Sequence, residues 1–333
     1  MIEKLEEAKT DALNSMDNFV REQLVLLKSV EDSWQPSDLL PDMVSEGWRD
    51  RVMELRERAA HISDEALVVL VGNLVTEEAL PSYQTWLNRI EEIRDMTGAD
   101  ETPWALWTRG WTAEENRHGD VLNKYLYLTG RVNMRSVEIT IQHLLKNGFD
   151  LKSGNDPYQS LVYAAFQERA TRIAHLNAGR LAEKNGDAVL GRICAAIAGD
   201  ETRHEEAYKR FFKELVRLDS AQAVIAFARM MRQKVAMPAR LMSDGVSEDL
   251  FTQFAIVAQK SGVYTARDYA EILEHLLDYW KIPSLSGLTG EAAEAQTYLC
   301  ELPARLSSKV EKTMELIQRL PKEPFSWIFG RSA

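Results

Sequence analysis

Cysteine is scarce in this sequence, and so are long apolar runs. Only two cysteines, Cys194 and Cys300, occur among the 333 residues, far apart in partly apolar helical surroundings, so we expect two reduced thiols and no disulfide framework. The best apolar stretch, around Leu67 to Val75, is interrupted by Gly72 and Asn73. It falls short of the roughly eighteen residues that span a bilayer, so we do not expect a membrane-spanning chain.

Positive charge is in deficit. The chain has 40 Lys and Arg residues against 51 Asp and Glu residues, which gives a formal net charge of −11. Nucleic-acid binding needs clustered positive charge to release counterions from phosphates, so no nucleic-acid partner is expected. The N-terminal segment, MIEKLEEAKTDALNSMDNF, lacks the basic and apolar regions of a signal peptide and the Arg-rich character of a transit peptide. Export is therefore not expected.

Strand patterns are also scarce, whereas helical periodicity covers most of the chain. Thr102-Pro103 and Asp156-Pro157 each place a capping residue before a proline at the first helical position. The sequence therefore predicts an all-α protein. The expected helices cover residues 10–30, 45–60, 64–96, 103–129, 134–147, 157–184, 187–216, 219–235, 247–261, 266–281 and 289–316.

Four of the expected helices are long enough to form a bundle. Residues 64–96, 103–129, 157–184 and 187–216 each make a helix of about 28 residues or more, which corresponds to roughly 40 Å. A long connection between the second and third helices is typical of ferritin-like four-helix bundles. We expect one large domain over residues 1–333, with the bundle at about 64–216 and accessory helices at 10–60 and 217–333.

Acid and imidazole side chains recur at helical spacing in these four helices. Glu115 and His118 stand three residues apart, as do Glu201 and His204, so each pair lies on one helix face. Glu77 and Glu168 each add one acid from a further long helix, in a comparable apolar setting. This set is expected for a carboxylate-bridged pair of iron or manganese ions, and four carboxylates would balance the charge of two divalent ions.

A single Glu-x-x-His on a helix is common and usually marks a solvated face. Two copies on long amphipathic helices, each preceded by a helix with a further acid, favour metal binding over that structural alternative. The remaining histidines, His61, His143, His175 and His275, are expected to be structural or surface residues. His175 shares a helix face with Glu168 but lies two turns away from it.

Several longer stretches resemble the soluble acyl-acyl carrier protein desaturases, a ferritin-like di-iron family that includes the plant stearoyl enzyme. The resemblance runs from SWQPSDLLP through MPARLMSDG to the terminal PFSWIFGR, and its most specific segments are VVLVGNLVTEEALPSYQTWLNRI, WTRGWTAEENRHGDVLNKYLYLTGRVNM, FQERATRIAH and AGDETRHEEAY. It implies a homodimer with two Fe²⁺ ions per subunit that takes electrons from reduced ferredoxin. The substrate would be a saturated fatty acyl chain on acyl carrier protein, which receives a cis double bond. The compartment would be the bacterial cytoplasm or, for a mature form, the plastid stroma.

The resemblance also implies roles for individual residues. Glu77 and Glu201 with His204, and Glu115 and Glu168 with His118, would be metal ligands, and the two Glu-x-x-His acids, Glu115 and Glu201, would bridge the ions.

Three further residues would act beside the ligands. Thr171 would deliver protons to reduced oxygen, although a helix threonine can equally bond back to the preceding turn. Asp200 would orient a ligand histidine, and Trp34, Asp200 and His118 would form an electron entry path, although Trp34 alone is also typical of a packed aromatic residue.

Two regions would contact the substrate and its carrier. Trp86 and Ile90 are expected at the acyl tunnel. Trp86 stands where common plant members of the family carry a smaller side chain, so we expect a preference for a chain other than stearoyl, although Trp86 can also be explained as packing between helices. The carrier is acidic, so a basic surface near the tunnel mouth is expected. The candidates are Arg49, Arg51, Arg56 and Arg58, which could instead form a solvated helix face.

Other functions are compatible with the same ligands. A di-iron hydroxylase or oxidase could act on another apolar substrate, and a ferritin-like protein could store iron or scavenge peroxide. A helical scaffold without metal is the remaining alternative. The long C-terminal third has no evident use in an iron store, which favours the desaturase.

Overall fold

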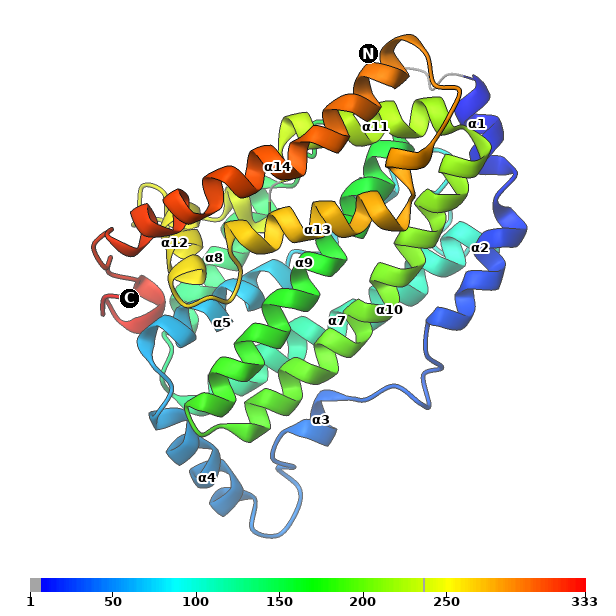
Figure 1. Ribbon diagram of the computed structural model, residues 1–333. Coiled ribbons are helices and arrows are strands. Elements are labelled where there is room, and N and C mark those ends of the chain that lie inside the picture. Colours follow the sequence, from blue (N-terminus) through cyan, green and yellow to red (C-terminus); the bar gives the residue numbers. More distant parts are fainter. Residues whose placement is uncertain (1–6, 236) are drawn as a thin grey trace.

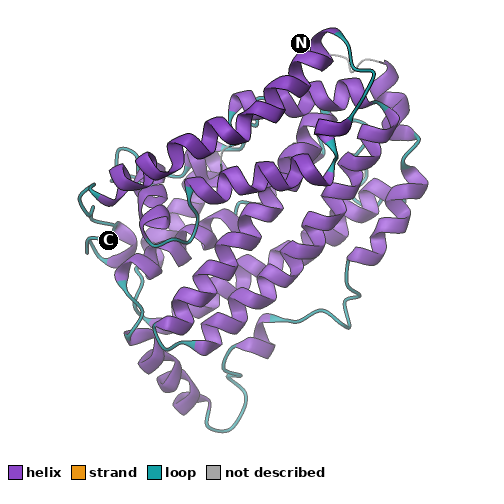
Figure 2. Ribbon diagram, in the orientation of Figure 1, coloured by secondary structure: helices purple, strands orange, loops and turns teal. Residues whose placement is uncertain are grey.

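The computed structural model describes residues 7–235 and 237–333, and this part of the chain consists of helices joined by loops and turns (Figures 1 and 2). The one β-type pairing within these residues is an isolated bridge between Pro324 and Ser332. The all-α prediction is therefore confirmed. The helices are α1 (Glu7–Asn14), α2 (Asp17–Gln23), α3 (Pro36–Leu39), α4 (Trp48–Ala60), α5 (Asp64–Glu77), α6 (Leu80–Leu87), α7 (Pro103–Thr129), α8 (Met134–Asn147), α9 (Pro157–Lys184), α10 (Ala188–Leu218), α11 (Ser220–Gln233), α12 (Leu250–Lys260), α13 (Ala266–Tyr279) and α14 (Gly290–Gln318), with short 3-10 turns at Leu24–Leu26, Pro238–Leu241, Ile282–Ser284 and Ser326–Ile328.

The predicted capping residues start the long helices. The Thr102 hydroxyl accepts a hydrogen bond from the Ala105 amide at the start of α7, and Asp156 accepts from two amides at the start of α9. Each cap is followed by a proline, whose missing N–H has no partner to lose at this position. The chain therefore enters both ligand-bearing helices at a fixed residue.

Two of the expected helices are broken in the structure. Residues 64–96 form α5, α6 and a series of turns, because Pro81 lacks the N–H that would continue the ladder to the Glu77 carbonyl. Residues 10–30 divide into α1, α2 and a 3-10 turn. The first break leaves Glu77 as the last residue of α5.

The four helices α5, α7, α9 and α10 pack together as the ferritin-like bundle, with α9 and α10 side by side along the molecule (Figure 1). Gly72 of α5 allows the Phe254 ring of α12 to pack directly on the backbone, since a Cβ there would lie 2.0 Å from the ring. The division into a bundle at 64–216 and accessory segments stays a prediction.

The bundle core consists of two apolar clusters with a polar layer between them. On α7, one cluster extends to Trp111 and the other begins at Val121, while on α9 the boundary falls between Ala170 and Ala174. On α10 the clusters end and begin at Ile197 and Ala207. The residues between these limits include both predicted Glu-x-x-His pairs, so the polar layer is enclosed by apolar core on both sides.

No single helix in the described ranges is long and apolar enough to cross a membrane. Trp48–Ala60 and Asp64–Leu87, which are bent by 115° at the break between them, meet the length and composition criteria only when taken together.

Candidate metal centre

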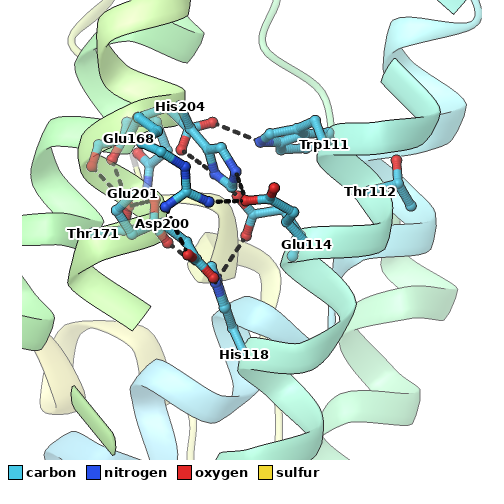
Figure 3. Close-up of polar contacts among 12 residues, drawn as sticks. Trp111, Thr112, Glu114, His118, Glu168, Thr171, Asp200, Glu201 and His204 are labelled. Carbon is cyan, nitrogen blue, oxygen red and sulfur yellow. Dashed lines mark hydrogen bonds and ion pairs between the residues drawn. The ribbon is translucent and has the colours of Figure 1, made fainter. Parts of the chain in front are cut away.

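Six buried side chains from four helices converge in the polar layer, and Figure 3 shows four of them, His118, Glu168, Glu201 and His204. The i, i+3 spacing places Glu115 beside His118 on α7 and Glu201 beside His204 on α10, as the sequence predicts. Glu77 reaches the layer from the end of α5, and Glu168 reaches it from the middle of α9. The six residues named from the sequence as metal ligands are therefore brought together.

Their donor atoms form two groups that share two acids. Glu77, Glu115, His118 and Glu201 can surround one ion, and Glu115, Glu168, Glu201 and His204 can surround another, with the donor atoms of each group within 4.8 Å of one another. Glu115 presents one oxygen to each imidazole, at 3.1 Å from His118 Nδ1 and 2.7 Å from His204 Nδ1. The shared positions of Glu115 and Glu201 are those of bridging carboxylates.

The structure corrects the grouping of Glu77 and Glu168, the two acids that each belong to a single metal position and are called terminal ligands below. The family resemblance implies Glu77 with His204 and Glu168 with His118, but Glu77 Oε2 lies 3.7 Å from His118 Nδ1 and Glu168 Oε2 lies 3.6 Å from His204 Nδ1. Helix order along the chain does not determine which helices face each other across the bundle.

The ring nitrogens fit a metal centre. His118 Nε2 lies 3.3 Å from Asp200, and His204 Nε2 lies 3.1 Å from Glu114. A carboxylate on Nε2 favours the tautomer that carries hydrogen there and leaves the Nδ1 lone pair free. In that tautomer both Nδ1 atoms are acceptors that face the acceptor oxygens of Glu115, at 3.1 Å and 2.7 Å, so no hydrogen bond satisfies either Nδ1 atom among the described residues. Buried acceptors that face four carboxylates suit divalent metal ions, which would accept these lone pairs and balance the charge.

Asp200 connects His118 to Trp34, as expected for the proposed electron path. Its Oδ2 accepts hydrogen bonds from Trp34 Nε1 at 2.9 Å and from Arg117 at 3.0 Å. Burial raises the pKa of Asp200, but His118 and the neighbouring arginines lower it more strongly, to about 2. The Trp34 ring lies almost parallel to the His118 ring, with 6.1 Å between centroids. The three residues are therefore in contact, while their role in electron transfer stays a prediction.

Thr171 contacts a ligand and also its own helix. Its hydroxyl lies 2.8 Å from Glu201 Oε2, and 3.0 Å and 3.1 Å from the carbonyls of Glu168 and Gln167. One hydroxyl proton can serve only one of these acceptors at a time. The geometry is thus compatible with both interpretations made from the sequence, proton delivery at the centre and a hydrogen bond back to the preceding turn.

Sequence reasoning missed three of the residues that hold the ligands. Trp111 Nε1 donates to Glu168 Oε1 at 3.1 Å, and Glu114 holds His204. The third is His175, whose Nε2 lies 2.8 Å from Glu77 Oε1. The expectation that His175 has no acidic partner at the centre is wrong, because its partner Glu77 lies on α5 rather than on its own helix. The expectation of a surface position is wrong too, since His175 is buried. Its position seven residues after Glu168, on the same face, was the available signal.

Comparison with known proteins identifies the family. The sequence model described as fatty acid desaturase matches residues 8–329. The chain belongs to the fatty acid desaturase family. It is 53% identical over 324 residues to a chloroplastic stearoyl-[acyl-carrier-protein] 9-desaturase of Olea europaea, covering 97% of this chain and 83% of that protein. It is 54% identical to a chloroplastic acyl-[acyl-carrier-protein] desaturase of Cucumis sativus, over 97% of this chain and 82% of that protein.

A solved structure shares the fold. DesA2 of Mycobacterium tuberculosis H37Rv, described as a candidate acyl-ACP desaturase, superposes with a TM-score of 0.54 over 87% of this chain and 99% of its own, at 16% identity. These comparisons confirm the resemblance and the fold class predicted from the sequence.

In this member of the desaturase family, a cavity of about 50 Å³ lies beside the metal centre. All four ligand carboxylates and Thr171 reach its wall, whereas the two ligand histidines do not. The remaining wall includes Trp86, Trp111, Tyr83 and Tyr163. The carboxylate side of the centre therefore faces a mostly apolar space, while the histidines face Asp200 and Glu114.

The predicted tunnel residues differ in their positions. Trp86 lines the cavity, and its ring packs edge-on against Phe149 and Tyr163 at 5.8 Å and 5.7 Å. Ile90 is buried in the adjacent core, outside the lining of the cavity. A second cleft of about 310 Å³ shares Tyr163 and Pro238 with the cavity, so the two spaces adjoin.

The burial of so many acids shifts their proton affinities. Burial lowers the pKa of His118 and His204, but the facing carboxylates raise it more, so both pKa values lie well above the ordinary value. Burial raises the pKa of Glu168 and Glu201, and the nearby Glu115 charge adds to the effect. Without a metal ion the site therefore holds protons that a metal ion must displace.

We predict that metal affinity rises with pH. Below their raised pKa values the two histidines, Glu168 and Glu201 are protonated, so each proton released on binding lowers the affinity by up to about tenfold per pH unit of acidification. Anaerobic titration of the metal-free protein with Fe²⁺ at pH 6, 7 and 8 measures this. An affinity that stays constant over this range would contradict the assignment of the site.

Proposed function

We propose that this protein is an acyl-acyl carrier protein desaturase, which introduces a cis double bond into a saturated fatty acyl chain. The observation that carries the proposal is the cavity wall, because four ligand carboxylates face a narrow apolar space. The names of the plant relatives support the carrier-bound acyl substrate. The chemistry that a bound iron pair supplies is the reduction of dioxygen.

The reaction removes two hydrogens from neighbouring carbons of the chain. Together with dioxygen, two electrons and two protons, these hydrogens give two molecules of water. Reduced ferredoxin supplies the electrons in this proposal. Storage of iron or scavenging of peroxide needs no apolar cavity at the carboxylates, so the desaturase is favoured over those alternatives.

The residues of this chain position the reactants and move protons. Apolar walls such as Trp86 and Tyr163 exclude water and hold an unactivated methylene beside the carboxylates, so that position alone selects the carbon that reacts. Thr171, in the same wall, can donate its hydroxyl proton toward the cavity or to Glu201. Electrons enter through Trp34, Asp200 and His118, on the side away from the acyl chain.

We predict that one turnover removes two hydrogens from the substrate. The iron-loaded protein is reduced anaerobically, mixed with a saturated acyl carrier protein substrate and exposed to oxygen, and the acyl chain is analysed by mass spectrometry. A mass loss of two hydrogens is expected. A gain of oxygen would instead assign the protein to the hydroxylases, and Glu115→Gln should give neither product because it removes a shared ligand charge.

Trp86 is proposed to limit the length of the acyl chain that fits. Its indole lines the cavity beside Tyr163 and packs edge-on against the rings of Tyr163 and Phe149. We therefore predict a preference for a chain other than stearoyl. Trp86→Leu should shift the ratio of kcat/KM values for stearoyl and palmitoyl substrates toward stearoyl by about tenfold. The smaller side chain would make room for the extra methylenes of the stearoyl chain, and each buried methylene contributes about 0.8 kcal/mol.

The control is Trp48→Leu, which changes a tryptophan at the start of α4, outside the cavity lining. Product analysis that finds an undiminished stearoyl preference in the unmodified protein would reject the role of Trp86.

The carrier needs a basic surface, and the structure offers two. On α4, Arg56 donates to the Leu128 carbonyl and Arg58 pairs with the buried Asp187, while Arg49 stacks on Trp48 and Arg51 donates to the Glu46 carbonyl. None of these arginines lines the cavity or its adjoining cleft. Docking at α4 therefore stays a prediction with no geometric link to the cavity.

We propose the adjoining cleft as the second docking surface. Lys152, Lys234 and Arg240 line it, are exposed, and have no acidic partner within residues 7–235 and 237–333. An acidic carrier over these cations would deliver its acyl chain directly toward the cavity.

We predict that Lys152→Glu combined with Lys234→Glu weakens carrier binding by about tenfold, whereas Arg49→Glu combined with Arg51→Glu does not. Binding is measured at low and high salt, because screening should reduce the difference. The reverse order of effects would place the carrier on α4, and binding indifferent to salt would argue against both surfaces.

The family resemblance further supports a homodimer with two iron ions per subunit. Light scattering on the purified protein tests the dimer, and a monomer at micromolar concentration would contradict it. The plant relatives are chloroplastic. The compartment of this chain, bacterial cytoplasm or plastid stroma, stays a prediction.

A further inference from the structure

His175 is a buried histidine at the edge of the metal centre, outside the six ligands. It lies on α9, one turn after Thr171, and only 1% of its surface is exposed. Its Nε2 atom is 2.8 Å from Glu77 Oε1, which is the shortest contact between Glu77 and a histidine in the described chain. The contact joins α9 to Glu77, the last residue of α5.

The chemistry of the pair sets the direction of the hydrogen bond. An ionised carboxylate only accepts hydrogen bonds, so His175 Nε2 carries the hydrogen and donates it to Glu77. In the neutral ring Nδ1 is then an acceptor, and it is buried without a partner among the described residues. An unpaired buried polar atom costs about 1–3 kcal/mol, so packing alone would favour an apolar residue at this position.

The other terminal ligand is held in a similar way by a different group. Trp111 Nε1 donates to Glu168 at 3.1 Å from the opposite helix. Each terminal carboxylate thus receives one N–H bond, from His175 on one side of the centre and from Trp111 on the other. The two metal positions differ in this outer contact, so they should respond differently to its loss.

We propose that His175 is a positioning residue that orients Glu77 and thereby sets the affinity of the metal position formed by Glu77 and His118. Outer hydrogen bonds to ligands typically change metal affinity by about 10- to 100-fold. The inference rests on the metal centre of the proposed function but not on desaturation, because it concerns binding in the absence of substrate.

The test is an anaerobic titration with Co²⁺, whose visible absorption reports ligation at each position. The unmodified protein should bind two equivalents. His175→Gln, whose amide N–H can take the place of Nε2–H, should also bind two at similar affinity. His175→Asn and His175→Leu should bind one equivalent normally and the second about 10- to 100-fold more weakly. His143→Leu, a half-buried histidine of α8 outside both ligand groups, is the matched control and should bind two.

The pattern of the variants separates positioning from packing. A thermal unfolding midpoint for each metal-free variant shows which variants are folded. If His175→Leu does not fold, the comparison of His175→Asn with His175→Gln separates positioning from packing. Equal binding by Asn and the unmodified protein would overturn the proposal, as would equal losses in Gln and Asn. If binding follows the predicted order but no acyl chain is desaturated, the proposed function fails while this inference holds.

Discussion

Four carboxylates buried within one layer of a helical bundle are the constraint on which the rest of this structure depends. Isolated charges in such surroundings cost several kcal/mol each, so the layer needs either protons or metal ions. Apolar clusters above and below the layer exclude water and so raise the free-energy cost of leaving these charges uncompensated. Two divalent ions would meet it at the shared acids Glu115 and Glu201, and the open carboxylate side would then face the apolar cavity.

The centre has two sides with different tasks. The histidines are backed by charged groups, with Asp200 and Arg117 leading to Trp34 near the surface. The carboxylates are backed by aromatic walls and one hydroxyl. In the proposed desaturase, electrons would follow the polar side and the acyl chain the apolar side, so the two would reach the same atoms from opposite directions. In a desaturase this separation would keep the oxidant away from water on the substrate side.

Spacing within one helix was readable from the sequence, and contacts between helices were not. The pairs Glu115–His118 and Glu201–His204 were predicted because three residues make almost one turn. His175 was missed, because its partner comes from a helix that the sequence gives no means of aligning. The grouping of Glu77 with His204 was wrong for the same reason.

Local breaks were a second limit of the sequence. Helical periodicity continues through residues 64–96, yet Pro81 ends the ladder and leaves Glu77 at a helix terminus. The proposed docking surface depends on segments that the sequence does not place together, because Lys152 and Lys234 come from separate loops and line one cleft. By contrast, the all-α class and the capped starts of α7 and α9 follow from local chemistry and were confirmed.

The central claim is that six side chains hold two metal ions in one layer of the bundle. Crystals of protein loaded anaerobically with Fe²⁺, measured at the iron absorption edge, test it most directly. The account predicts two anomalous peaks per chain, one between Glu77 and His118 and one between Glu168 and His204, with Glu115 and Glu201 contacting both. A fully loaded crystal with no peak in this layer, or with iron bound only at the protein surface, would contradict it.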